Sequence, residues 1–327
     1  MDNFSLIKAP IGKELEEFKK IFDSSVTSPN ALLNDVVAHI RRRNGKMMRP
    51  ILVFLVARTQ GPVLPPSTYH TALALELLHT ASLVHDDVVD ESSERRGQLS
   101  VNAVFNNKVA VLSGDYLLAT SLMHAELSDS HPIIRLIATL GRDLSDGELL
   151  QLANVSNPSF SEAVYFEIIR KKTAALFAAC TQAAALSVGI TDADRIESAR
   201  LFGEHLGICF QIKDDIFDYA DHNESIGKPT GNDMLEGKLT LPALYAINST
   251  GDTEAKRLAV LVKEGSASSE DIARLVAFTK SHGGIEYAVQ AMHDYKRKAL
   301  ELLAPLPESE VRQALEAYLD YVVDREK

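Results

Sequence analysis

Carboxylates gather in two short stretches of this chain. The first is VHDDVVDESSERRG at residues 84–97, and the second is DDIFD at residues 214–218. In each stretch two aspartates stand four residues apart, so on a helix they share one face, while another is turned about 100° away. Carboxylates this close repel one another, so each stretch either lies in open water or binds cations. The facing pairs are Asp86 with Asp90 and Asp214 with Asp218, and the supporting carboxylates are Asp87 and Asp215.

The chemistry that suits such pairs is the binding of hard divalent cations. Mg²⁺ prefers carboxylate oxygen and often shares its coordination shell with substrate phosphates. Two aspartate pairs that face each other across a bundle of helices would hold several ions around one diphosphate. A single acidic motif is as readily a solvated helix end. The second copy, again behind an apolar helix, favours metal binding.

A site for a metal-bound diphosphate also needs positive side chains. The chain carries 34 Lys and Arg against 45 Asp and Glu, a net charge of −11. This balance argues against a nucleic-acid binder and makes basic residues near the motifs informative. Arginine binds phosphate oxygens in a bidentate way, whereas lysine acts as a point charge. The candidates are Lys46, Arg49, Arg95, Arg96, Lys172, Lys228 and Lys238.

Helices must position these groups. Apolar residues recur at steps of three and four, and alternating runs typical of strands are nearly absent. One helix is expected to begin near Pro66 and lead into the first motif, and another to run from Phe202 into the second. Residues 91–97 and 225–242 are loop-like. The sequence therefore predicts an all-α protein, a single domain over residues 1–327.

Cysteines and termini indicate the compartment. Cys180 and Cys209 lie in apolar contexts and give no disulfide framework, which is typical of a reducing cytoplasm. The N-terminus has no signal-peptide pattern. The uncharged run Thr173–Thr191 is rich in alanine and predicts a buried helix rather than a membrane span. We expect a cytoplasmic protein with no stable membrane anchor.

With these residues in place, the chain resembles the trans-isoprenyl diphosphate synthases, and among them the long-chain, octaprenyl-like members. The matching stretches, in family order, are GKMMRP, ELLHTASLVHDDVVDESSERRG, GDYLL, DGELLQL, KKTAALF, FQIKDDIFDY and GKPTGNDMLEGKLTLP. The resemblance implies an isoprenoid-synthase-type helical bundle around a central apolar cavity. It also implies a Mg²⁺-dependent prenyltransferase with three ions per active site. It would join isopentenyl diphosphate to an allylic diphosphate as a homodimer. A very apolar product suggests delivery at a membrane surface.

The resemblance also implies a role for each candidate residue. Metal ligands would be Asp86, Asp90, Asp214 and Asp218. Isopentenyl diphosphate would be bound by Lys46, Arg49, His79 and Arg96. The allylic diphosphate and its reacting end would be bound by Arg95, Lys172, Thr173, Gln211, Lys228 and Lys238. The chain departs from the family pattern at Asn44, Met47, Asn232 and Leu239, none of which removes a principal ligand.

Product length in this family depends on side-chain bulk just before the first motif. Here these positions hold Ala81 and Ser82, both small, where short-chain members typically carry an aromatic residue. One helical turn rises about 5.4 Å, close to one extended isoprene unit. Small residues leave the cavity open below, so we expect a product longer than geranylgeranyl, with octaprenyl as the central value. The floor of the tunnel is expected within residues 133–140 or near Leu122 and Met123.

Four alternatives stay open at this point. A shorter-chain synthase, making farnesyl or geranylgeranyl diphosphate, differs only in product length. A metal-dependent phosphohydrolase would use the His85-Asp86 pair but leaves the second motif unexplained. A terpenoid cyclase or head-to-head synthase would not need the isopentenyl site. A non-catalytic subunit of a heteromeric synthase should lack aspartates from one motif, whereas all six are present.

Overall fold

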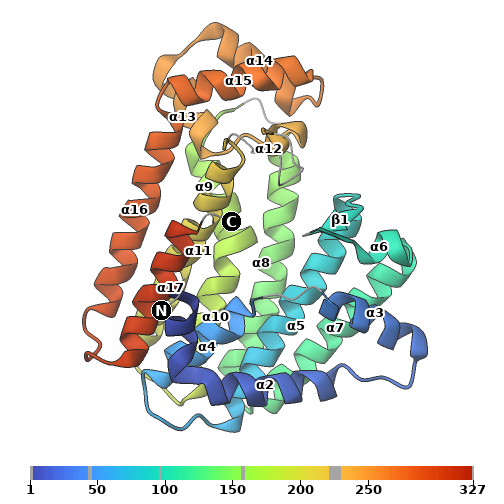
Figure 1. The fold of residues 1–327 in the computed structure, drawn as a ribbon, viewed down its shortest axis with the longest axis vertical. Helices are drawn as coiled ribbons and strands as arrows, with labels where there is room; N and C mark the ends of the chain where they lie inside the picture. The colour runs from blue at the N-terminus through green and yellow to red at the C-terminus, as the bar shows by residue number, and fades with distance from the viewer. Residues whose placement is uncertain (1–2, 43–45, 96, 156–158, 221–229, 326–327) are drawn as a thin grey trace. The chain divides into compact units, whose positions relative to one another are not determined.

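The computed structural model describes residues 3–42, 46–95, 97–155, 159–220 and 230–325, and almost all of its regular structure is helical (Figure 1). The predicted all-α class is confirmed. The chain divides into two compact units, each built from three segments. Unit 1 comprises Met1–Gly141, Leu176–Arg200 and Leu306–Tyr318, and unit 2 comprises Arg142–Ala175, Leu201–Pro305 and Leu319–Lys327. A single domain stays a prediction.

Unit 1 carries the first acidic motif. Its longest helix, α5, begins with Pro66 in its first turn, where the missing N–H costs no hydrogen bond. This helix packs along α7, and the two are drawn side by side in Figure 1. The elements wholly within unit 1 are α1 (Asn3–Lys8), the 3₁₀ helix η1 (Ala9–Ile11), α2 (Gly12–Ser25), α3 (Ala31–Arg42), α4 (Met48–Arg58), α5 (Pro66–Val89), β1 (Glu94–Arg95), β2 (Gln98–Leu99), α6 (Val101–Val104) and α7 (Asn107–Leu127).

Unit 2 carries the second motif. The elements wholly within it are α9 (Glu162–Ile169), the π-helix η2 (Arg170–Ala174), α12 (Asn232–Leu235), α13 (Leu241–Thr250), α14 (Thr253–Lys263), α15 (Ser269–Ser281) and α16 (Gly284–Leu303). Four helices contribute residues to both units: α8 (His131–Val155), α10 (Ala175–Ser187), α11 (Ala193–Phe217) and α17 (Glu310–Asp324).

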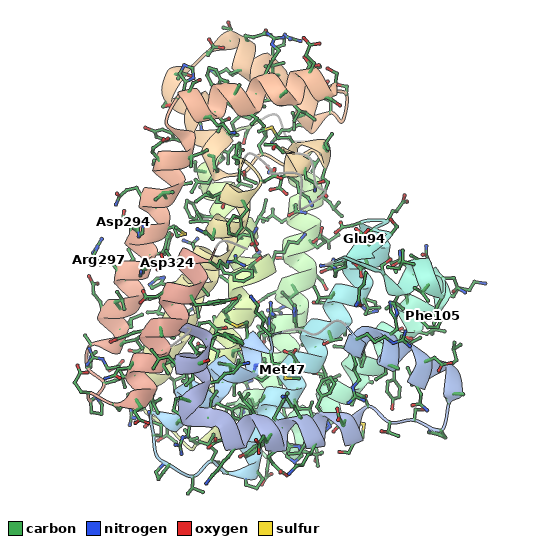
Figure 2. The ribbon with its side chains drawn as sticks, in the orientation of Figure 1. Met47, Glu94, Phe105, Asp294, Arg297 and Asp324 are labelled. Carbon is green, nitrogen blue, oxygen red and sulfur yellow. The ribbon has the colours of Figure 1, made fainter. Side chains whose placement is uncertain are left out.

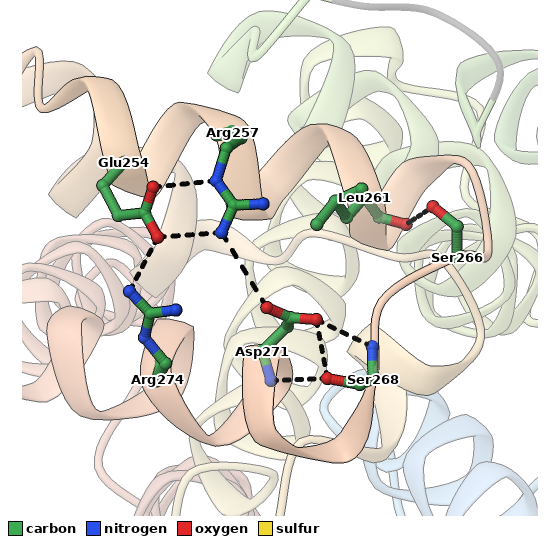
Figure 3. Close-up of polar contacts among 7 residues, drawn as sticks. All are labelled: Glu254, Arg257, Leu261, Ser266, Ser268, Asp271 and Arg274. Atoms are coloured by element: carbon green, nitrogen blue, oxygen red, sulfur yellow. Dashed lines mark hydrogen bonds and ion pairs between the residues drawn. The ribbon is translucent and has the colours of Figure 1, made fainter.

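Polar contacts fix the α14–α15 pair within unit 2 (Figure 3). Ser268 caps α15 in a capping box, since its side chain accepts from the backbone N–H of Asp271 and the Asp271 carboxylate accepts from the N–H of Ser268. Glu254 on α14 accepts from Arg257 at 2.8 Å and from Arg274 of α15 at 2.7 Å. These pairs are exposed, so each adds little stability, but together they set the register of the two helices.

Both stretches expected to be loops contain short regular elements. In the first, β1 pairs with β2 in an antiparallel arrangement, with Glu94 opposite Leu99. In the second, α12 forms over four residues. Both carboxylate oxygens of Asp218 accept backbone hydrogen bonds at its start, from Asn232 at 2.9 Å and Asp233 at 3.1 Å. Helix α12 was missed because Asp218 caps it from another part of the chain.

None of the helices that the structure describes combines the length and the apolarity required to cross a bilayer.

Candidate functional site

The first motif ends helix α5 in unit 1. The backbone N–H of Asp90 donates to the carbonyl of Asp86 at 2.8 Å, so the helical path continues to Asp90. The two aspartates therefore lie on one face, as their spacing predicts. Asp86 is half-buried and Asp90 is exposed, which leaves both carboxylates accessible. An apolar cluster of Val36, Val84, Val101 and Ala110 packs around the last turns of α5.

Asp87 is fully buried and holds the β1–β2 pair against the helix. Its Oδ1 accepts from Nε of Arg95 at 2.5 Å. Its backbone carbonyl accepts from the amide of Asn102 at 3.2 Å. The supporting role predicted for Asp87 agrees with these contacts. Arg95, predicted to bind a diphosphate, is held by Asp87 in this structure, while Arg96 and Lys228 lie outside the described residues.

His85 packs against α7 at Gly114. The His85 Nε2 atom lies 3.2 Å from the carbonyl of Val111 and 3.4 Å from Oδ1 of Asp115. A Cβ atom built on Gly114 would lie 2.2 Å from that nitrogen, so the glycine of the GDYLL stretch leaves room for the imidazole. His85 thus has the contacts of a packed helix histidine.

The predicted isopentenyl-binding residues of unit 1 lie on two packed helices, α4 and α5. Lys46 is exposed just before α4, and Met47 turns the chain there with φ 50°, a conformation uncommon outside glycine (Figure 2). The Arg49 guanidinium lies 5.3 Å from the Phe177 ring centroid. His79 on α5 is 9% exposed.

The Cys180 thiol is fully buried in unit 1. Burial raises the pKa of Cys180 to about 12, and the charges of Arg49 and Glu76 act on it in opposite directions. Glu76 lies three residues before His79 on α5.

The residues predicted to set product length lie one turn before the first motif. Ala81 is 2% exposed, and the Ser82 hydroxyl donates to the carbonyl of His79 at 2.9 Å. Leu122 and Met123 are exposed in the single chain, so they do not form a tunnel floor within it. Within residues 133–140, Leu136 and Thr139, together with Arg135, line a largely apolar groove of about 410 Å³. Its other lining residues are His131, Pro132, Gln182, Leu186 and Ile196.

Unit 2 gathers five of the predicted site residues around one pocket of about 170 Å³. Five helical elements, α8, α9, η2, α11 and α12, and the segment before α13 supply its polar groups. The pocket is lined by Gln151, Asn154, Val155, Tyr165, Ile168, Ile169, Lys172, Thr173, Gln211, Asp215, Asp233, Gly237, Lys238, Leu239 and Thr240. Lysines, amides and carboxylates thus converge at one place.

A chain of hydrogen bonds orients the pocket's side chains. Thr173 donates to Oε1 of Gln211 at 2.6 Å, and Nε2 of Gln211 donates to Asp215 at 2.8 Å. The buried Tyr165 hydroxyl donates to the other oxygen of Asp215 at 2.5 Å. Asp215 is therefore a buried anchor for Gln211. Sequence reasoning missed Tyr165, because nothing in its local context separates it from a core tyrosine.

Carboxylates crowd beneath the second motif. Burial, followed by the charge of Asp233, raises the pKa of Asp215 well above its ordinary value. Burial, followed by the charge of Asp218, raises the pKa of Asp233 to about 7. Lys238 opposes this second shift and pairs with Glu236 at 2.6 Å. Crowding and burial therefore favour protonation of these carboxyls, and a bound cation would favour their ionised forms instead.

The π-helix η2 shapes the lysine side of the pocket. Its residues RKKTA include Lys172 and Thr173, and π-helical turns occur often at functional sites. Gly147 of α8 lies beneath it, where an added Cβ would come 2.8 Å from Cβ of Lys171 and 3.0 Å from the backbone nitrogen of Lys172. Lys172 of η2 forms an ion pair with Glu148 of α8, the residue that follows Gly147. Gly147 thus permits the close approach that places Lys172.

Asp214 is one of the two predicted metal ligands of the second motif, the other being Asp218, and it faces the end of α17. Its Oδ1 accepts from Nη2 of Arg325 at 2.7 Å. The same guanidinium donates to the carbonyl of Phe210 at 3.0 Å and stacks 4.0 Å from that ring's centroid. Sequence reasoning did not single out Arg325, which lies 111 residues from its partner.

The donor set of the motifs fits Mg²⁺. Within the described part of the chain, no group of three His, Cys, Asp or Glu side chains is placed to ligate one ion. Mg²⁺ is commonly held by one or two carboxylates, with substrate phosphates and water completing its shell. Accessible aspartates such as Asp86, Asp90 and Asp214 meet that requirement. A preformed all-protein cage is not needed.

Comparison with known proteins gives one consistent family. Residues 30–279 match the family model described as polyprenyl synthetase. The chain is 35% identical over 322 residues to octaprenyl diphosphate synthase of Haemophilus influenzae, covering 95% of this chain and 97% of that protein. It is 34% identical over 319 residues to the geranyl-diphosphate-specific all-trans-nonaprenyl-diphosphate synthase of Rhodobacter capsulatus, with 98% and 97% covered.

Solved structures extend the comparison. A geranylgeranyl pyrophosphate synthase from Bacteroides thetaiotaomicron is 60% identical, with a TM-score of 0.87 and coverage of 99% of this chain and 100% of that one. A polyprenyl synthase from Caulobacter crescentus, complexed with calcium and isoprenyl diphosphate, is 32% identical, with a TM-score of 0.91 and coverage of 99% and 98%.

Proposed function

Because the chain belongs to the polyprenyl synthetase family and is a trans-polyprenyl diphosphate synthase, we propose that it condenses isopentenyl diphosphate with an allylic diphosphate. The reaction depends on Mg²⁺, and the product is a long-chain all-trans polyprenyl diphosphate. The main structural support for this proposal is the unit 2 pocket. There Lys172, Thr173, Gln211 and Lys238 converge beside a buried acidic cluster.

The proposed roles follow from the contacts in that pocket. Lys172 and Lys238 bind the allylic diphosphate after exchanging their carboxylate partners, Glu148 and Glu236, for phosphate oxygens. When bound, Mg²⁺ neutralises the diphosphate and favours its departure from the allylic carbon. Gln211 is oriented by the hydrogen bonds described above, so its oxygen and that of Thr173 face developing positive charge with little reorganisation.

The carbon–carbon bond forms between the ionised allylic group and the double bond of isopentenyl diphosphate. Lys46, Arg49 and His79 hold the second substrate, with Arg96 as a further proposed contact. The attack leaves a positive charge on the isopentenyl unit, and loss of a proton from the adjacent carbon forms the new double bond, with the released diphosphate as the proton acceptor. Water must be excluded during these steps, because it would capture the allylic cation.

Two product lengths are supported by different observations. The small side chains at Ala81 and Ser82, and the curated octaprenyl and nonaprenyl relatives, favour a long chain. The structure that is 60% identical is described as a geranylgeranyl pyrophosphate synthase, and it favours four isoprene units. Octaprenyl diphosphate is the primary proposal, and geranylgeranyl diphosphate is the second candidate.

A homodimer is proposed for the same enzyme. Helix α7 exposes Val111, Leu112, Leu122, Met123 and Leu127. A surface helix in a stable monomer rarely carries so many exposed apolar side chains. A second copy that covers this helix would remove them from water.

The decisive experiment follows incorporation of labelled isopentenyl diphosphate by the purified chain with Mg²⁺ and each of four allylic primers: dimethylallyl, geranyl, farnesyl and geranylgeranyl diphosphate. We expect incorporation, with products sized by chromatography after removal of the diphosphate. Asp86→Asn and Asp214→Asn should each lower turnover by about 10²-fold or more. Failure to incorporate label with every primer would overturn the assignment, and a C20 product would select the second candidate.

A further inference from the structure

We propose that Arg325 is a positioning residue that competes with divalent cations for Asp214. Asp214 enters here as a metal ligand, a role that belongs to the proposed function. Nη2 of Arg325 lies 2.7 Å from Oδ1 of Asp214, and the Arg325 side chain is 13% exposed whereas that of Asp214 is 42% exposed. The guanidinium therefore binds one oxygen of a carboxylate side chain that is more exposed than its partner.

Three contacts hold the guanidinium at this position. It stacks over the Phe210 ring at 4.0 Å, lies 5.6 Å from the Phe217 ring centroid, and donates to the carbonyl of Phe210 at 3.0 Å. Phe210, Asp214 and Phe217 lie four and three residues apart on α11, so one face of that helix forms the cradle. An arginine seated by stacking and hydrogen bonds loses little freedom when it pairs with the carboxylate.

Competition follows from the chemistry of the shared atom. A cation that binds Oδ1 of Asp214 is either repelled by the neighbouring Arg325 guanidinium or has to displace it. Both effects weaken metal binding. In the metal-free enzyme the guanidinium relieves part of the repulsion within the acidic cluster. Arg325 thus stabilises the empty site and makes occupancy by metal more dependent on the arrival of the negatively charged substrate.

The test measures Mn²⁺ binding without substrate, from the electron paramagnetic resonance signal of free Mn²⁺. Arg325→Gln and Arg325→Met both remove the charge, and the methionine keeps an apolar stem over Phe210. Each should bind Mn²⁺ about three- to tenfold more tightly than the wild type, the factor expected for removal of a partly buried ion pair of modest strength. Arg325→Lys, which keeps the charge, should stay close to the wild type.

Two controls test whether a change in Mn²⁺ affinity arises from the Arg325–Asp214 pair. Arg297→Gln removes an exposed arginine of α16 that pairs with Asp294 at 3.3 Å and Glu301 at 3.2 Å, and it should leave Mn²⁺ affinity unchanged (Figure 2). In an Asp214→Asn background, Arg325→Gln should have no further effect. Unchanged or weaker Mn²⁺ binding in both neutral variants, with folding verified by circular dichroism, would overturn the competition. Because no prenyl substrate is present, loss of the proposed reaction would not alter this result.

Discussion

At the scale of single residues, the two motifs use their aspartates differently. Spacing alone separates facing from supporting positions, and the helical path confirms that Asp86 and Asp90 share a face, whereas the supporting role of Asp87 stays a prediction. Spacing does not reveal that Asp218 caps α12 with both oxygens, or that Asp215 is anchored by Tyr165. These partners lie 14 to 50 residues away, so only the folded chain brings them together.

The anchor beneath Gln211 can be tested with Tyr165→Phe. This change removes the hydroxyl that donates to Asp215, leaving a buried carboxylate short of one hydrogen bond. The free energy of unfolding should fall by about 1–3 kcal/mol, measured by denaturant unfolding. Tyr116→Phe on α7, outside the pocket, serves as the matched control. Equal stability of Tyr165→Phe and the wild type would show that the hydrogen bond contributes nothing.

Product length belongs to the residue scale as well. Ala81→Phe should shorten the product to about three or four isoprene units, because the ring would block the cavity one helical turn below the first motif. Chromatography of the dephosphorylated products gives the length. Ala138→Phe adds the same bulk at an exposed position of α8 and should leave length unchanged. An unaltered product from Ala81→Phe would mean that the chain does not grow past this residue.

At the scale of elements, the sequence predicts the long helices well and the irregular ones poorly. Helix α5 begins at Pro66 and ends beside the first motif, as apolar spacing and proline placement indicate. The π-helix η2 leaves no comparable mark, since RKKTA has the composition of an ordinary helical turn. Its geometry depends on packing over Gly147, a contact between distant parts of the chain.

That contact makes a glycine of α8 testable. Gly147→Ala should weaken allylic substrate binding, seen as a higher KM, and lower the melting temperature, because the new Cβ would press on the backbone of Lys172. Gly141→Ala on the same helix meets nothing within 4 Å and should raise stability by about 0.5–1 kcal/mol. If both variants behave alike, close approach at Gly147 is unimportant.

The packing of α5 on α7 includes a histidine pair that predicts acid sensitivity. Nδ1 of His70 and Nδ1 of His124 lie 3.0 Å apart in stacked rings. One of the two nitrogens therefore carries the hydrogen and donates it to the other. Burial, followed by the charge of His70, lowers the pKa of His124 to about 4. The unfolded chain binds this proton near pH 6.5, so stability should be lost as pH falls from about 6.5 toward 4.

A thermal unfolding series between pH 7.5 and pH 5 measures this loss. His124→Gln should flatten the dependence of the melting temperature on pH, whereas His131→Gln, at an exposed position of α8, should not. A wild-type slope in His124→Gln would place the acid sensitivity elsewhere.

At the scale of the whole molecule, the exposed apolar residues of α7 predict self-association. Met123, 65% exposed, should lie in the interface of the proposed dimer. Met123→Glu would bury a charge there, so light scattering after gel filtration should report monomer instead of dimer. Val63→Glu changes an even more exposed apolar residue away from α7 and should leave the dimer intact. A dimeric Met123→Glu would indicate another interface.

The interleaved segments of the two units also bear on how the protein is made. Unit 1 needs residues 306–318 and unit 2 needs residues 319–327, although each unit starts far earlier in the chain. During translation, neither unit can complete its packing until these late segments have left the ribosome. Helices α4 and α5 of unit 1 are therefore synthesised well before residues 306–318, which belong to the same unit. We therefore expect a chain truncated before residue 306 to aggregate instead of forming a folded half.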